Sequence, residues 1–64
     1  MKKQHLEFLE YLLSDMSYKE IAIKMNKSVY DVMNYRQNLT RQFNVRGRAG
    51  LMMVALQLKN NANK

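Results

Sequence analysis

The chain is organised around residues Ser17–Phe43, which have the sequence SYKEIAIKMNKSVYDVMNYRQNLTRQF. Ser17 and Glu20 have the spacing of a capping box, in which the hydroxyl accepts a backbone N–H of the first turn and the carboxylate accepts the cap N–H. We therefore expect a helix that begins at Tyr18 and ends near Met25. Its apolar stripe is only about two turns long, so this helix needs a partner against which to bury it.

A second, longer helix is expected from Val29 to Phe43, after the short turn Asn26-Lys27-Ser28. Ser28 is a good N-cap, and Asp31 is interpreted as capping its own helix at the positive end of the helix dipole. One face of the helix carries Val32, Tyr35, Arg36, Leu39 and Phe43, and the opposite face carries Tyr30, Met33, Asn34, Gln37 and Arg41. Two helices joined in this way are typical of a helix-turn-helix, whose second helix is polar where DNA would lie.

Two further helices are expected on either side of this pair. The first covers about residues 5–14, with a main inward stripe of Leu6, Leu9 and Leu13 and with Leu12 beside it. The last covers about residues 48–58, with Gly47 as its N-cap. The sequence thus predicts an all-α fold, a compact four-helix bundle with a helix-turn-helix whose recognition helix is the third. We expect a single domain over 1–64, with an ordered core at about 5–58 and a loose polar tail at 59–64.

The last predicted helix is apolar over more of its circumference than one core contact requires. One stripe consists of Leu51, Val54, Ala55 and Leu58, and a second consists of Ala49, Met52, Met53 and Leu56. A second apolar stripe on a terminal helix implies a second surface that buries it, so we interpret it as a dimer interface. The alternative is a helix that lies deep in a small core and is apolar all round.

The formal charge of +6 lies entirely in the second half of the chain. Residues 1–31 contain five cationic and five acidic side chains, whereas residues 32–64 contain six cationic side chains and no Asp or Glu. Basic surfaces bind phosphates by Coulomb attraction and counterion release, so nucleic acid is the first partner to consider. Small basic domains without such a partner are the alternative.

The composition argues against catalysis, cofactors and membrane insertion. The chain has no cysteine and one histidine, and it has no glycine-rich phosphate loop, so nothing assembles a nucleophile, a base and an oxyanion donor. Glu7 and Glu10 are interpreted as a solvated helix face, and His5 as a surface histidine without a partner. No apolar run approaches the roughly 20 residues that span a bilayer. We expect a cytoplasmic domain with no cofactor, no metal and no small-molecule substrate.

The order of the residues resembles a known family. The resemblance rests on Tyr18-Lys19-Glu20-Ile21-Ala22, Met25, Ser28, Val32, Tyr35, Leu39, Phe43-Asn44-Val45 and Arg46-Gly47-Arg48-Ala49-Gly50-Leu51. Together these residues resemble the four-helix DNA-binding domain of the LuxR/FixJ/NarL family, and most closely the output domains of bacterial response regulators. The resemblance covers roughly residues 6–58.

This resemblance implies a transcription regulator that binds double-stranded DNA as a dimer, with the third helix in the major groove and the fourth helix in the dimer contact. It places Met33, Asn34 and Gln37 against base edges, and phosphates against Ser17, Tyr18, Lys19, Lys27, Ser28 and Arg41. Asn and Gln can make paired hydrogen bonds to adenine, whereas Met offers only an apolar contact, such as one to a thymine methyl group. We expect a weak homodimer that DNA completes, because one short helix face is a small interface.

Two questions stay open at this point. Regulators of this family mostly carry an N-terminal receiver or ligand-sensing domain, so the chain is either an excised output domain or a stand-alone regulator. The second question is function: a small anti-activator of the same fold would pair with a full-length regulator through the last helix and keep it off DNA. Asp31 and Met33 on the expected reading face motivate this alternative.

Overall fold

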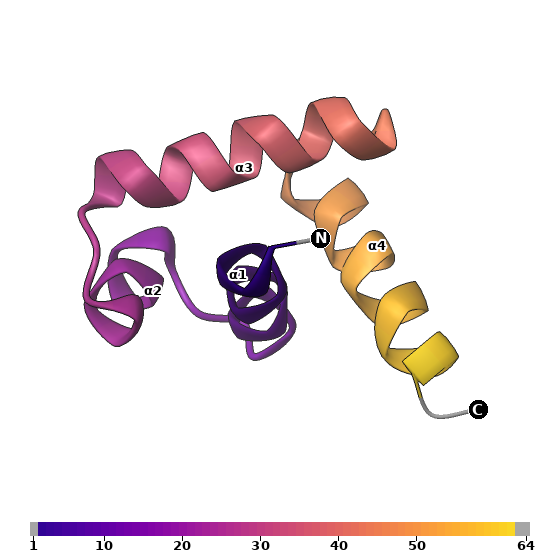
Figure 1. The fold of residues 1–64 in the computed structure, drawn as a ribbon, viewed down its shortest axis with the longest axis horizontal. Helices are drawn as coiled ribbons and strands as arrows, with labels where there is room; N and C mark the ends of the chain where they lie inside the picture. Colours follow the sequence, from indigo (N-terminus) through magenta and orange to yellow (C-terminus); the bar gives the residue numbers. More distant parts are fainter. Residues whose placement is uncertain (1, 63–64) are drawn as a thin grey trace.

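The computed structural model describes residues 2–62 and folds them into four helices, shown in Figure 1. The helices are α1 (Lys3–Leu13), α2 (Tyr18–Met25), α3 (Val29–Phe43) and α4 (Gly47–Ala62). Helix α3 crosses one side of the bundle, with α2 near its start, α1 beside its middle and α4 near its end (Figure 1). The predicted all-α fold with a helix-turn-helix formed by α2 and α3 is confirmed.

Both helices of the helix-turn-helix begin with a capping box. The Ser17 hydroxyl accepts the Glu20 N–H at 3.1 Å, and the Glu20 carboxylate accepts the Ser17 N–H at 3.3 Å. In the same way, the Ser28 hydroxyl accepts the Asp31 N–H at 3.0 Å, and the Asp31 carboxylate accepts the Ser28 N–H at 3.3 Å. These bonds satisfy N–H groups that have no partner inside a helix. The predicted starts of α2 and α3, and the interpretation of Asp31 as a cap, are therefore confirmed.

The same two helices end at asparagines in the left-handed conformation. Asn26 closes α2 with a φ of 56°, and Asn44 closes α3 with a φ of 53°. Asparagine tolerates this conformation better than most residues with a Cβ atom. The chain therefore turns sharply within a few residues after each helix, and α3 packs against both α2 and α4.

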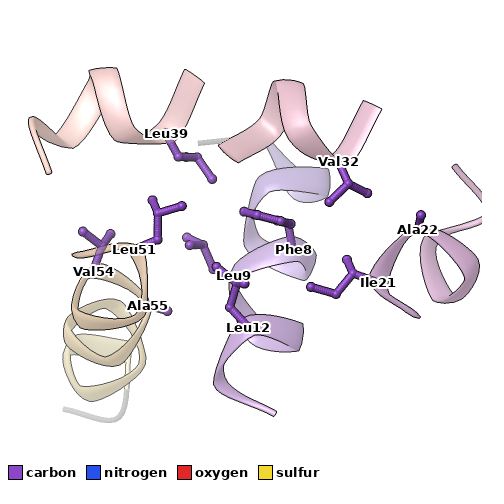
Figure 2. Close-up of a cluster of buried hydrophobic side chains, with 10 residues drawn as sticks. All are labelled: Phe8, Leu9, Leu12, Ile21, Ala22, Val32, Leu39, Leu51, Val54 and Ala55. Atoms are coloured by element: carbon purple, nitrogen blue, oxygen red, sulfur yellow. The ribbon is translucent and has the colours of Figure 1, made fainter. Parts of the chain in front are cut away.

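Ten buried apolar side chains form the core, and α1 lies at its centre (Figure 2). They are Phe8, Leu9 and Leu12 of α1, Ile21 and Ala22 of α2, Val32 and Leu39 of α3, and Leu51, Val54 and Ala55 of α4. The predicted inward stripe of α1 is partly wrong, because Leu6 is 43% exposed while Phe8 is fully buried. The side chains that point inward are those of a helix surrounded by the other three, rather than those of a single stripe (Figure 2).

Two predicted helix boundaries need correction. Helix α1 begins at Lys3, two residues before the predicted start, and its cap residue Lys2 makes no side-chain cap bond. Helix α4 continues to Ala62, so the predicted loose tail at 59–64 is wrong for 59–62, and 63–64 lie outside the described residues. Once packing has formed a helix, each further residue adds a backbone hydrogen bond at little extra cost. Lys59 in the last turn also complements the helix dipole.

The turn between α3 and α4 is built on two glycines with different roles. Gly47 was predicted to be the N-cap, but it is the first residue of α4 and has a φ of +64°, and the Arg46 carbonyl accepts the Gly50 N–H at 3.3 Å. Glycine suits this backbone because a Cβ atom is strained there. A Cβ atom at Gly50 would lie 2.9 Å from the Val45 Cβ, so Gly50 lets α4 pass close to the turn.

Candidate nucleic-acid interface

The three residues predicted to read bases lie together on the outer face of α3. Met33, Asn34 and Gln37 line one shallow groove, and Tyr30, Arg36 and Thr40 complete the wall formed by α3. The opposite wall consists of Val45, Arg46 and Gly47 from the α3–α4 turn, and the groove encloses about 590 Å³. The helix turns its other face to the core, where Val32 and Leu39 are fully buried. The structure thus presents the polar face of α3 to the outside while the core fixes the helix.

The predicted phosphate contacts lie around the beginnings of α2 and α3. Ser17, Lys19, Lys27 and Ser28 are all exposed. Each serine hydroxyl accepts a backbone N–H in its capping box, which leaves the hydroxyl proton free to be donated to an oxygen such as that of a phosphate. Arg41 is also exposed, but it lies in the last turn of α3, at the other end of that helix.

Tyr18 has a second role that the sequence did not indicate. Its ring stacks near Phe8 at a centroid distance of 6.4 Å, and the guanidinium carbons of Arg36 and Arg48 lie 5.9 Å and 5.0 Å from its ring centroid. Cations over an aromatic face are attracted by the ring quadrupole. The first residue of α2 is therefore held by side chains from α1, α3 and α4.

Arg48 connects α4 to the turn between α1 and α2. Its guanidinium donates a hydrogen bond to the Met16 carbonyl as well as lying over Tyr18. Sequence reasoning used Arg48 only as part of a motif and assigned it no contact. No local signal could reveal the contact, because Met16 lies 32 residues away in the chain.

Arg36 and Arg46 are two cations of the groove that sequence reasoning did not select. Arg36 occupies the inward face of α3, as predicted, and is half-buried, with an Nε atom that is buried and has no hydrogen-bond partner. Arg46 is exposed on the α3–α4 turn. Arg36 could have been found from the sequence, because it is a charged residue on the helix face that otherwise carries apolar side chains. For Arg46, the signal was a cation in the turn that directly follows the recognition helix.

His5 is not the isolated surface residue that was predicted. It is half-buried, and its ring meets the edge of the Tyr35 ring at a centroid distance of 5.3 Å and an interplanar angle of 73°. Burial lowers the pKa of His5 below its ordinary value, and the nearby charge of Lys2 lowers it further. Both effects disfavour the protonated form of the imidazole.

Helix α4 divides its two apolar stripes between the core and the surface. Leu51, Val54 and Ala55 of the first stripe are buried, as predicted. In the second stripe, Met53 is 64% and Leu56 is 51% exposed, and Ala49 is also exposed, while Met52 packs partly against the core. The alternative of a helix buried on all sides is thus wrong.

A second groove lies between α1 and α4. Its lining is mainly apolar and consists of Leu6, Leu9, Leu13, Ala55 and Leu58, with Glu10, Ser14 and Lys59 at its polar positions. Within residues 2–62, no group of three or more His, Cys, Asp or Glu side chains could hold a metal ion. None of the helices in this part of the chain is long and apolar enough to cross a membrane.

The fold and the outer face of α3 define a helix-turn-helix domain of the DNA-binding class: two capped helices joined by a short turn, the second lying on the outside of a small bundle. Residues 3–55 match the family model described as bacterial regulatory proteins, luxR family, and the chain therefore belongs to this family. Its members are DNA-binding transcription regulators rather than enzymes. Searches of the curated proteins and of the solved structures found no match.

Proposed function

We propose that this domain reads DNA sequence by placing α3 in the major groove, with Met33, Asn34 and Gln37 against base edges. The observation that carries the proposal is that these three side chains share one outer groove while the opposite face of α3 is fixed in the core. A rigid helix that presents a polar face is the arrangement by which helix-turn-helix proteins read bases.

The chemistry of the three side chains defines the bases they would read. Asn34 and Gln37 each carry a donor and an acceptor, which match the N6 and N7 edge of adenine. Met33 is 36% exposed and offers an apolar surface that suits a thymine methyl group. The domain is therefore expected to favour sites rich in A·T pairs at the positions below α3.

Phosphate contacts would fix the position of α3 on the duplex. We assign them to the six predicted residues, which are Ser17, Tyr18, Lys19, Lys27, Ser28 and Arg41. Support comes from the exposure of the lysines, the serines and Arg41, and from the starts of two helices, where N–H groups and the dipole favour an anion. The ring contacts of Tyr18 leave its role at the phosphate dependent on its hydroxyl alone.

Dimerisation would occur through the exposed stripe of α4. Met53 and Leu56 are its two large exposed residues, with Ala49 at the start of the helix and Met52 at the edge of the core. So small an apolar surface is below what a stable dimer buries, so the dimer is expected to be weak and to form on DNA. Sedimentation that shows a tight dimer at low micromolar concentration would contradict this expectation.

The experiment that tests the proposal is selection from a random duplex DNA pool with the purified domain at near-physiological salt. Sequencing of the retained DNA should show two related half-sites about one helical turn apart, because a two-fold dimer places two recognition helices at that spacing. Enrichment of no sequence by the folded protein would contradict sequence reading.

A second candidate function is that of an anti-activator, and one observation favours it. Ile23, Val29 and Tyr30 on the helix-turn-helix are 71%, 44% and 75% exposed, so this part of the domain presents apolar side chains at its surface. Such a domain would pair with a full-length regulator through α4 and would have little affinity for DNA of its own. Failure to enrich DNA, together with heterodimer formation in sedimentation with such a regulator, would establish this function instead.

A further inference from the structure

The groove beside α3 has a basic lining. Two of the side chains that line it, Arg36 and Arg46, are cationic, and none is acidic. Residues 32–64 contain no Asp or Glu. The acidic residue that directly precedes this stretch is Asp31, and its carboxylate accepts a hydrogen bond from the Ser28 N–H. The Arg36 guanidinium lies over the Tyr18 ring, so Arg46 is the exposed cation of this lining. A groove with an exposed guanidinium and no carboxylate is suited to an anion.

The position of the groove limits what that anion can be. It runs alongside the face that holds Asn34 and Gln37, so any duplex read by these residues would also cover the groove. The major groove is about 12 Å wide, close to the 10–12 Å diameter of a helix with its side chains. A helix that enters it is therefore closely flanked by the two sugar–phosphate strands.

The shape of the turn leaves room for such a strand. Apart from its chain neighbours and the backbone of its own helix, a Cβ atom built on Gly47 would meet no heavy atom within 4 Å, so the space next to this residue is open. Arg46 precedes Gly47 and is exposed, and its long side chain can reach a phosphate without displacing any packed group.

We propose that the groove between α3 and the α3–α4 turn seats one sugar–phosphate strand of duplex DNA, and that Arg46 binds a phosphate of this strand. This inference rests on the proposed function, since it applies to the duplex that α3 reads. Arg46 is thus a positioning residue that fixes how far α3 enters the major groove. Phosphate contacts of this kind set register and orientation but carry no sequence information.

The test measures duplex binding by Arg46→Ala as a function of salt. Each phosphate contact contributes about 0.9 to the slope of log affinity against log salt concentration, so the variant should show a slope smaller by about 0.9. Between about 50 mM and 200 mM salt, the ratio of the variant and wild-type dissociation constants should therefore fall by about 3.5-fold. Arg46→Lys should keep the wild-type slope, because it keeps the charge.

The matched control is Lys59→Ala, which removes another exposed cation, from the far end of α4. It should leave the slope unchanged. Arg46→Ala should also weaken binding to the selected site and to a scrambled duplex by the same factor. A wild-type slope in Arg46→Ala would overturn this inference and leave the proposed function standing. A wild-type domain that binds no duplex would instead overturn the proposed function, and the inference with it.

Discussion

The guanidinium carbon of Arg48 lies 5.0 Å from the ring centroid of Tyr18, although one residue belongs to α4 and the other begins α2. These two helices each pack against α1 and α3 rather than against each other. The same guanidinium donates a hydrogen bond to the Met16 carbonyl just before α2. One side chain therefore links α4 to the start of the helix-turn-helix.

Replacement of Arg48 should destabilise the fold and displace the start of α2. We expect Arg48→Ala to lower the free energy of unfolding by about 1–3 kcal/mol, since it removes a cation–π contact and a charged hydrogen bond. Arg48→Lys should recover only part of this loss, because an ammonium cannot match both contacts at once. Urea denaturation measures both values, with Lys59→Ala as the exposed control. An unfolding midpoint in Arg48→Ala equal to that of the wild type would show that the contacts of Arg48 do not contribute to stability.

Substitution of Gly50 should be harmful although it lies inside a helix. Alanine is a better helix former than glycine by about 1 kcal/mol, so propensity alone would make Gly50→Ala stabilising. The new Cβ atom would lie 2.9 Å from the Val45 Cβ, which has no freedom to rotate away, so we expect a net loss of stability. Thermal denaturation decides the sign, and Ala49→Gly, at an exposed site of the same helix, measures the propensity by itself.

A change of Gly47 should destabilise for a different reason. Its φ of +64° is costly for any residue with a Cβ atom, so Gly47→Ala is expected to lose about 1–2 kcal/mol even though the space is open. Gly47→Asn should lose less, because asparagine tolerates this conformation, as Asn26 and Asn44 do here. Equal losses for the two variants would argue against backbone strain as the cause.

Loss of a base-reading side chain should reduce specificity more than affinity for random DNA. Gln37→Ala and Asn34→Ala are each expected to weaken binding to the selected site by about 1–3 kcal/mol, and to leave random duplex binding nearly unchanged. Lys19→Ala should weaken both alike, because phosphate contacts are independent of sequence. Asn38→Ala is the control, since Asn38 is exposed on α3 but does not line the groove. Equal loss on both duplexes in Gln37→Ala would remove Gln37 from the base-reading set.

Stability should fall when the pH is lowered through the range in which His5 titrates. The pKa of His5 is lowered in the folded state, chiefly by burial, so the unfolded chain binds the proton more strongly. The free energy of unfolding therefore decreases as the pH falls below about 6.5, the ordinary histidine value, towards the folded pKa. Chemical denaturation between about pH 5 and 8 measures this dependence. His5 is the one histidine of the chain, so His5→Gln should flatten the curve. A curve of the same shape in both proteins would assign the effect to another group.

Local rules in the sequence were sufficient for the helix-turn-helix itself. The capping boxes at Ser17 and Ser28 and the turn at Asn26 each involve atoms only a few residues apart, so the starts of α2 and α3 could be predicted to the residue. The buried stripe of α4 could also be predicted from periodicity, because apolar residues recur on one face of the helix at each turn. Helix ends without a cap signal, at Lys3 and Ala62, were misplaced.

The sequence by itself thus determined the four helices, the short turn and the polar face of α3, because hydrogen bonds and side-chain periodicity within one helix are set by neighbouring residues. The tertiary structure alone decided which side of α1 faces the core, the contact of Arg48 with Met16 and the groove that Arg46 shares with α3. These features depend on how the helices cross. That arrangement is fixed by the packing of side chains far apart in the chain, which no local pattern contains.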